Sequence, residues 1–178
     1  MKYVKVKNLD QKAAQLFLGT GWFAAPHEES VFKLLDDYFL AGGNVIDAGR
    51  FYSGGDSERV ITRWLESRRM MAKRESFLIV NKACHHFVDE NNVQYPERNR
   101  VKPDFITEDL EYSLHSMKQP YFDIYLLHRD NPEEPVEGLI DRLERHRREG
   151  QIKVYGVSNW SLDRIAAAQE YARKAGYQ

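Results

Sequence analysis

Four side chains able to take part in proton transfer stand at or just beyond the ends of short apolar stretches. They are Asp47, Tyr52, Lys82 and His128. A tyrosine with the ordinary pKa of about 10 is a poor proton donor near neutral pH. A neighbouring ammonium favours the phenolate, and a carboxylate keeps that ammonium charged and in place. An imidazole can orient a carbonyl oxygen, so the four groups suit protonation of an oxyanion while a hydride arrives at carbon.

Each of these residues alone also has an ordinary explanation. Asp47 could cap a turn, Tyr52 could pack on the surface, and Lys82 could be a solvated strand end. A lone histidine such as His128 is usually a satisfied buried side chain. Their occurrence at successive strand ends favours the chemical interpretation.

An alternation of strand-like and helical segments must position these groups. Predicted strands comprise a short stretch at 17–18 leading into Gly19-Thr20-Gly21, then 44–47, 77–81, 122–127 and 152–157. Predicted helices follow them at 28–41, 56–68, 107–117, from Pro135 to Gly150 and from Ser161 to about 175. Asp56 or Ser57, Thr107 and Ser161 are the predicted N-caps, and 83–106 is a predicted polar loop.

Five consecutive βα units predict parallel strands and an α/β fold, either a doubly wound sheet or a barrel. In a parallel barrel all strand carboxyl ends open on one face, where active sites are found. An eight-unit barrel typically needs ~250 residues, so 178 residues leave room for about five of the eight units.

Several of these segments resemble motifs of the aldo-keto reductase family. NVIDAGRFYSGGDSE, at 44–58, resembles the signature around the family's catalytic aspartate and tyrosine. DIYLLHR, at 123–129, resembles its histidine-bearing fourth strand, and GQIKVYGVSNW, at 150–160, resembles its fifth. Lys82 falls where the family keeps its lysine, and the resemblance runs from about Leu16 onward.

The resemblance implies a (β/α)8 TIM-barrel fold, truncated after the fifth βα unit, with residues 1–178 as a single incomplete barrel domain. It also implies reversible, NADPH-dependent reduction of an aldehyde or ketone to an alcohol. In that reaction Tyr52 is the general acid, Lys82 makes its proton easier to release, Asp47 pairs with Lys82, and His128 orients the carbonyl.

The resemblance also assigns a cofactor site and a substrate pocket. The cofactor-binding residues it implies are Gly19, Thr20, Gly21, Asp47, Ser158 and Asn159. Trp22 and Phe51 are candidate walls of the substrate pocket, with ordinary packing as an equal alternative.

The family's sixth to eighth strands, with the groups that bind the adenosine 2′-phosphate, have no counterpart in the sequence. We therefore expect a fragment that binds NADPH poorly and has little or no activity. Its first and fifth strands would form open edges that invite self-association.

The composition limits the classes of partner that this protein is expected to bind. The 26 basic and 27 acidic residues nearly balance, which gives no electrostatic case for binding nucleic acid or a membrane surface. No apolar stretch is long enough to cross a bilayer, and the first ten residues make a poor signal peptide. With Cys84 as the single cysteine, we expect a cytoplasmic protein that acts on a small carbonyl compound.

Two other groups of residues have competing interpretations. Cys84, His85 and His86 could bind zinc, but no regularly spaced fourth ligand follows, so we expect loop residues near the pocket and no metal. Arg98, Arg100 and Lys102 form a basic stretch that is either a solvated face or an active-site cover.

Two other functions remain open at this point. Lys82 could be the Schiff-base nucleophile of a lyase, which trapping with borohydride would reveal. The chain could also be a reductase-like binding or regulatory subunit, which a Tyr52→Phe change without effect on function would support. The sequence does not distinguish NADPH from NADH, name the substrate or give the oligomeric state.

Overall fold

A five-stranded parallel sheet forms the centre of the computed structural model, which describes residues 1–89, 91 and 93–177. The strands lie in chain order across the sheet: β3 (Leu18–Gly19), β4 (Val45–Asp47), β5 (Leu78–Ala83), β8 (Phe122–Leu127) and β9 (Ile152–Val157). β3 and β9 are the two edges. Asp47 pairs with Val80, and Lys82 pairs with Leu126, so the carboxyl ends of the central strands meet at one rim.

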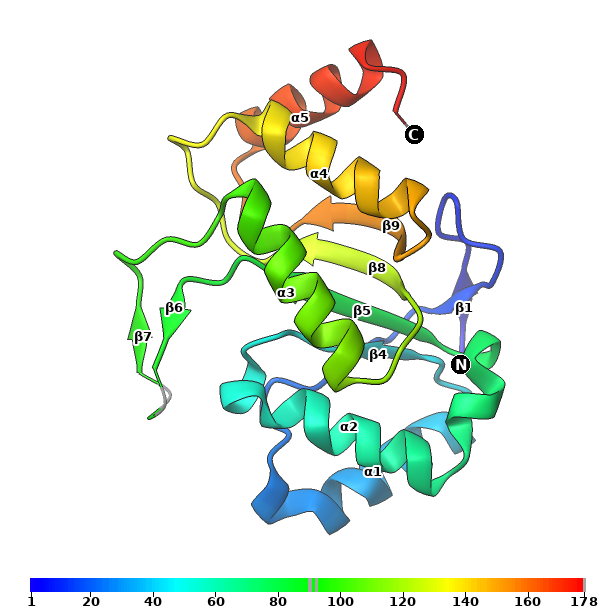
Figure 1. Ribbon diagram of the computed structural model, residues 1–178. Helices are drawn as coiled ribbons and strands as arrows, with labels where there is room; N and C mark the ends of the chain where they lie inside the picture. The colour runs from blue at the N-terminus through cyan, green and yellow to red at the C-terminus, as the bar shows by residue number, and fades with distance from the viewer. Residues whose placement is uncertain (90, 92, 178) are drawn as a thin grey trace.

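Helices connect successive strands and follow one another along the sheet (Figure 1). They are α1 (Glu28–Leu40), α2 (Asp56–Ser67), α3 (Pro103–Ser116), α4 (Val136–Arg148) and α5 (Leu162–Lys174), with short 3-10 segments at Ala25–His27, Tyr52–Gly55 and Met70–Ser76. Two small antiparallel hairpins complete the structure: β1 (Tyr3–Val4) with β2 (Ala13–Ala14), and β6 (Phe87–Val88) with β7 (Gln94–Tyr95).

Alternation along the strands produces two apolar layers. Side chains such as Ile46, Ile79 and Tyr125 pack among the helices in the larger core. Their strand neighbours Val45 and Leu78 face the other way. They join a second cluster with residues of the N-terminal segment, namely Leu9, Ala13 and Ala14. The hairpin β1–β2 therefore belongs to the segment that covers the sheet face opposite the helices.

Several expectations from the sequence are confirmed. The strands at 122–127 and 152–157 have the predicted bounds, and α1, α2, α4 and α5 lie where helical periodicity placed them. Ser161 is the N-cap of α5, and its hydroxyl accepts a hydrogen bond from Arg164 N at 3.3 Å. β5 continues to Ala83, two residues past the predicted end at 81, so Lys82 lies within the strand.

The predicted caps of α2 were wrong. Its N-cap is Gly55, whose φ of +89° suits glycine, and no side chain caps the helix. The carboxylate of Asp56 pairs with Arg59 instead. The Ser57 hydroxyl donates to Thr20 Oγ1 at 2.8 Å. Asp56 is thus used in an i,i+3 pair within the helix and Ser57 in a tertiary contact, neither of which the cap rule anticipates.

The predicted loop at 83–106 and the Thr107 cap also needed correction. The hairpin β6–β7 lies within that loop, and α3 begins at Pro103, whose fixed φ and missing N–H suit the first turn of a helix. Thr107 is therefore inside α3, where its Oγ1 lies 2.7 Å from Arg142 and 2.9 Å from His146. It links α3 to α4.

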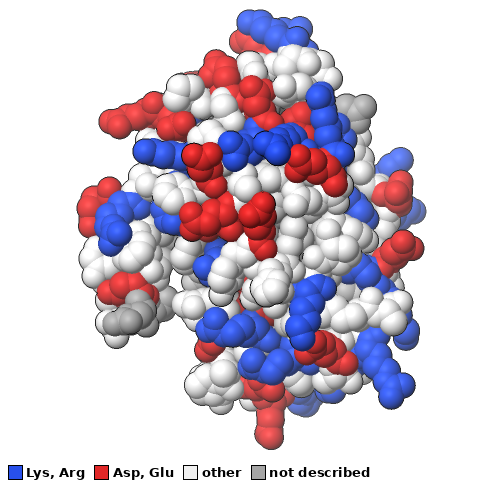
Figure 2. Space-filling view, viewed as in Figure 1, with Lys and Arg blue, Asp and Glu red and all other residues white. Residues whose placement is uncertain are grey.

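Charged side chains of both signs lie beside one another over the face shown in Figure 2. Arg100 departs from the expected solvated stretch, because its side chain is only 14 % exposed and pairs with Asp109 at 2.7 Å. No helix within the described residues combines the length and apolar character needed to cross a membrane.

Candidate active site

The sheet alternation directs three of the four candidate catalytic groups to the same side. Asp47 is two residues beyond Val45, Lys82 is two beyond Val80, and Val45 and Val80 belong to the cluster on the face opposite the helices. His128 follows the end of β8 and extends the ladder, with its backbone N–H bonded to Ala83 O at 2.7 Å. We call Asp47, Tyr52, Lys82 and His128 the rim site.

Lys82 and Asp47 form an ion pair across the neighbouring strands β4 and β5. Lys82 Nζ donates to Asp47 Oδ1 and, at 2.8 Å, to the carbonyl oxygen of Ala48. The Lys82 side chain is 7 % exposed and that of Asp47 is 31 % exposed. Two oxygen acceptors thus fix the ammonium group in a largely buried position.

Tyr52 lies in the turn after β4 and contacts both Lys82 and His128. The Lys82 Nζ atom is 4.7 Å from the centroid of its ring, and the His128 ring meets it edge to face at 5.5 Å. A Cβ atom added at Gly49 would stand 3.3 Å from three atoms of the Tyr52 ring, so glycine provides the space that the ring occupies. The turn contains Ser53 at a φ of +50°, which is a strained conformation for a non-glycine residue.

His128 is neutral at neutral pH in this setting. Burial lowers its pKa to about 3, and the charges of His85, Lys82 and Arg129 add to the effect. The ring is 8 % exposed, and Nδ1 has no hydrogen-bond partner in the part of the chain that the structure describes. A neutral imidazole at this place can donate a hydrogen bond to a substrate oxygen through one ring nitrogen.

Two further residues reach the rim: His85, which the sequence placed in a loop near the pocket without a role, and Arg129, which it did not assign. His85 packs 4.8 Å from His128 and 5.9 Å from Phe51, measured between ring centroids. Burial lowers the pKa of His85 to about 4. Arg129 Nη2 lies 3.2 Å from His85 Nε2. Their positions just beyond the ends of β5 and β8 were the signal that could have identified them.

Cys84 does not share the position of its histidine neighbours. Its thiol is buried in the core, and burial strongly raises its pKa. Across residues 1–89, 91 and 93–177, no three or more histidine, cysteine or acidic side chains gather as potential metal ligands.

The segment after β9 holds the backbone beside His128. Asn159 Nδ2 donates to His128 O at 2.8 Å and to Ser158 Oγ at 3.0 Å, and Trp160 Nε1 donates to Arg129 O at 2.9 Å. Asn159 is exposed. None of the described residues donates to its Oδ1, so this oxygen is available to a ligand.

The Gly19-Thr20-Gly21 segment borders Asp47 from the other side. Thr20 is buried, and its hydroxyl donates to Asp47 O at 3.0 Å and accepts from Ser57 Oγ. Its side chain therefore supports the rim from within the protein. Gly19 and Gly21 are exposed, with open space where a Cβ would be, and Trp22 is 55 % exposed.

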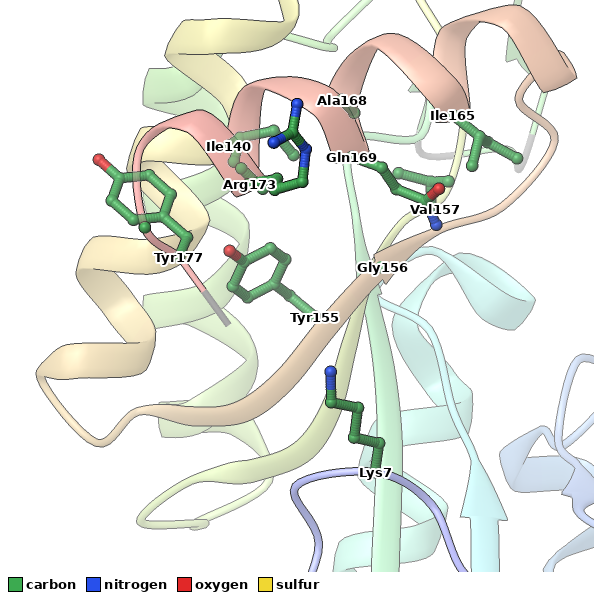
Figure 3. Close-up of a pocket in the computed structure, with 12 residues that line it drawn as sticks. Lys7, Ile140, Tyr155, Gly156, Val157, Ile165, Ala168, Gln169, Arg173 and Tyr177 are labelled. Carbon is green, nitrogen blue, oxygen red and sulfur yellow. The ribbon is translucent and has the colours of Figure 1, made fainter.

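A cavity of ≈ 700 Å³ lies elsewhere, between β9 and α5 (Figure 3). Tyr155, Val157, Ile165 and Ala172 supply apolar surface, and Lys7 reaches it from the N-terminal segment. We call this cavity the edge groove, because β9 is the last strand of the sheet. It contains none of the four rim-site residues.

Comparison with known proteins assigns the chain to a family. The sequence profile of the Aldo/keto reductase family matches residues 15–178. The chain belongs to the aldo/keto reductase family. The resemblance inferred from the motifs at Asp47, His128 and Ser158 is thereby confirmed.

Individual family members are distant and longer. The aryl-alcohol dehydrogenase [NADP(+)] of Phanerodontia chrysosporium is 28% identical over 153 residues, which cover 84% of this chain and 39% of that protein. The aldo-keto reductase YhdN of Bacillus subtilis is 24% identical over 171 residues, covering 93% of this chain and 49% of the relative. The chain spans about half the length, or less, of these curated relatives.

A solved structure confirms the fold. The glycerol dehydrogenase AKR11B4 from Gluconobacter oxydans superposes on this chain with a TM-score of 0.81. The match covers 96% of this chain and 52% of the glycerol dehydrogenase chain. The sequence identity is 22%, so this likeness bears on the fold alone. The five parallel strands and their helices are therefore those of a TIM-barrel-type aldo/keto reductase.

Proposed function

We propose that this aldo/keto reductase chain carries the proton-donating site of a reversible, NADPH-dependent reduction of an aldehyde or ketone to an alcohol. The observation that supports it most directly is the contact of Tyr52 with both Lys82 and His128 at the rim. The names of relatives such as aryl-alcohol dehydrogenase [NADP(+)] point to the same class of reaction.

In the proposed reaction, bound NADPH supplies a hydride to the carbonyl carbon. Tyr52 gives its hydroxyl proton to the carbonyl oxygen, which completes the alcohol, and solvent returns a proton to the phenolate. The ammonium of Lys82 stabilises that phenolate, and Asp47 holds the ammonium in place. Neutral His128 donates a hydrogen bond that orients the carbonyl oxygen.

The residues beside β9 fit the amide group of a nicotinamide. Asn159 Oδ1 can accept from the amide nitrogen, while the Ser158 hydroxyl, which already accepts from Asn159, can donate to the amide oxygen. The exposed backbone at Gly19 and Gly21 leaves room on the opposite side. This fit supports the cofactor roles that the resemblance implies for Ser158, Asn159, Gly19 and Gly21.

The contacts of Lys82 favour this function over a Schiff-base lyase. Its nitrogen donates to Asp47 and to Ala48 O, and the side chain is almost fully buried. Both acceptors and the burial engage this nitrogen, whereas a Schiff-base lysine needs its nitrogen free to attack a carbonyl carbon. The complete set of four polar groups likewise favours turnover over a purely regulatory role.

We propose that the 178-residue chain alone binds NADPH weakly, since its relatives are about twice as long and the resemblance assigns the adenosine phosphate to regions outside the match. A fluorescence titration with NADPH should show a dissociation constant above the micromolar range. Micromolar or tighter binding would contradict this proposal. We propose a cytoplasmic location, consistent with the single buried thiol.

The test of the proposed function is the loss of one hydroxyl group. With millimolar NADPH and benzaldehyde, Tyr52→Phe should lower the rate of NADPH oxidation by about a hundredfold or more, as expected for removal of a general acid. Tyr112→Phe is the matched control, because Tyr112 is 43 % exposed and stacks on Arg50 outside the rim site. A measurable wild-type rate that Tyr52→Phe does not lower would contradict the proposal.

A further inference from the structure

Arg129 is a cation at the rim for which the described residues supply no acidic partner. Three other basic side chains are paired: Lys82 with Asp47, Arg100 with Asp109, and Arg164 with Asp130. Arg129 forms no ion pair with any of the described residues, and its side chain has a single hydrogen-bond contact, to His85. Its Nε is buried and has no acceptor there. A guanidinium has five N–H donors, so most of the binding capacity of Arg129 is unused.

The guanidinium lies next to the proposed reaction centre. It contacts His85, the His85 ring packs 4.8 Å from that of His128, and His128 packs against Tyr52. Arg129 also contributes to the lowered pKa of both His85 and His128, so its charge is felt at both rings. Because Asp47 is already matched by Lys82, the charge of Arg129 is left uncompensated at the rim.

The backbone at Arg129 is fixed. Trp160 Nε1 donates to Arg129 O at 2.9 Å, and Asn159 donates to the preceding carbonyl, that of His128. These bonds hold the backbone from which the guanidinium and the imidazole project, and the Arg129–His85 contact limits the freedom of the guanidinium itself. Such preorganisation lowers the entropy lost when a ligand binds.

We propose that Arg129 is a specificity-determining residue that selects carbonyl substrates bearing a carboxylate a few bonds from the reacting carbon. The planar guanidinium matches a carboxylate with two parallel hydrogen bonds, and the neighbouring Phe51 and His85 supply flat surface for the part between carboxylate and carbonyl. The proposal rests on the proposed function of the rim site and adds the substrate class.

The test compares two aldehydes that differ in one charge, 4-carboxybenzaldehyde and methyl 4-formylbenzoate. Arg129→Gln should lower kcat/KM for the acid about tenfold or more, mainly through KM, because a charge-assisted contact is lost. The ester should change by less than about twofold, because it lacks that contact. Arg129→Lys should fall between, since lysine keeps the charge without the planar fork.

The matched control is Arg69→Gln, which removes the same charge from an exposed position at the opposite, amino-terminal end of β5. This variant should leave unchanged the ratio of kcat/KM for the acid to kcat/KM for the ester. An acid-to-ester ratio that is the same in wild type and Arg129→Gln would overturn the role of Arg129 and leave the reductase function standing.

A binding measurement separates this proposal from a failure of the proposed function. If the chain reduces neither aldehyde, benzoate is titrated while the imidazole NMR signals of His85 and His128 are followed. Shifts that saturate in the wild type and vanish in Arg129→Gln would support the anion site without any turnover. Signals that do not move in the wild type would overturn it.

Discussion

The rim site and the edge groove belong to the same sheet but are completed in different ways. Lys82 and His128 stand on or just beyond central strands that have neighbours on both sides, and each is less than one-tenth exposed. Tyr155 and Val157 stand on β9, which pairs only with β8 among the described strands, and both are half-buried. Strand neighbours on both sides thus allow polar groups to be held in a fixed arrangement.

The edge groove, unlike the rim site, is mainly apolar. Apolar side chains of β9 and α5 line it, and the charged groups that reach it, Lys7 and Arg173, come from opposite sides of the cavity (Figure 3). Exposed apolar surface of this kind favours contact with other apolar groups. The two regions therefore differ in kind: the rim site presents polar groups in a fixed arrangement, and the edge groove presents an apolar surface.

The largest expected difference between the rim site and the edge groove is in the catalytic effect of replacing one lysine in each. Lys82→Met removes the ammonium beside Tyr52 and leaves Asp47 unpaired, so kcat/KM for benzaldehyde should fall about a hundredfold or more. Lys7→Met makes the same chemical change at the edge groove and should stay within about twofold. Initial rates of NADPH oxidation check both variants, and similar losses in the two would erase the distinction between the regions.

The second prediction concerns how the free energy of unfolding depends on pH. His85 and His128 have pKa values lowered to about 4 and about 3, so they are neutral in the folded protein and take up protons on unfolding below pH 6.5. The free energy of unfolding should therefore fall on acidification from pH 7 to 4, by at most about 1.4 kcal/mol per pH unit for each histidine. Urea unfolding at several pH values measures this slope.

The matched comparison for the pH effect is the double variant His85→Phe/His128→Phe, which should show a shallower slope than wild type. His27→Phe, at an exposed position before α1, should keep the wild-type slope. A double variant with the full wild-type slope would mean that the rim histidines are not held neutral.

A smaller effect is expected at the wall of the edge groove. Ser161→Ala removes the hydroxyl that caps α5 and should lower the free energy of unfolding by about 1 kcal/mol. Ser30→Ala, at an exposed position inside α1, should cause a loss no larger than a few tenths of a kcal/mol. Equal losses in the two urea curves would show that α5 does not depend on its cap.

The smallest effect tests the apolar character of the edge groove. The dye ANS should fluoresce with the wild-type chain, and Ile165→Lys should reduce the signal by about half, since Ile165 lines the groove. Leu162→Lys changes a more exposed residue of the same helix that does not line it, and the signal should persist. If Leu162→Lys removes more signal than Ile165→Lys, the dye binds elsewhere.

The sequence alone determined the features that depend on short-range rules. Periodicity in steps of two and of about 3.6 located the strands at 122–127 and 152–157 and four of the helices, because these patterns are local. It also placed Asp47, Lys82 and His128 at or near the carboxyl ends of the central strands, which meet at one rim, although β5 continues to Ala83. The Ser161 cap followed from the same local chemistry.

Only the tertiary structure decided which distant groups would satisfy one another. Thr107 and Ser57 have the chemistry of caps but bond to other elements, and Arg100 lies against Asp109 instead of facing solvent. The strands of the β1–β2 and β6–β7 hairpins have two residues each, too few to show a period. The positions of His85 and Arg129 beyond two strand ends indicate the rim, but their contacts with His128 and with each other depend on packing between separate strands.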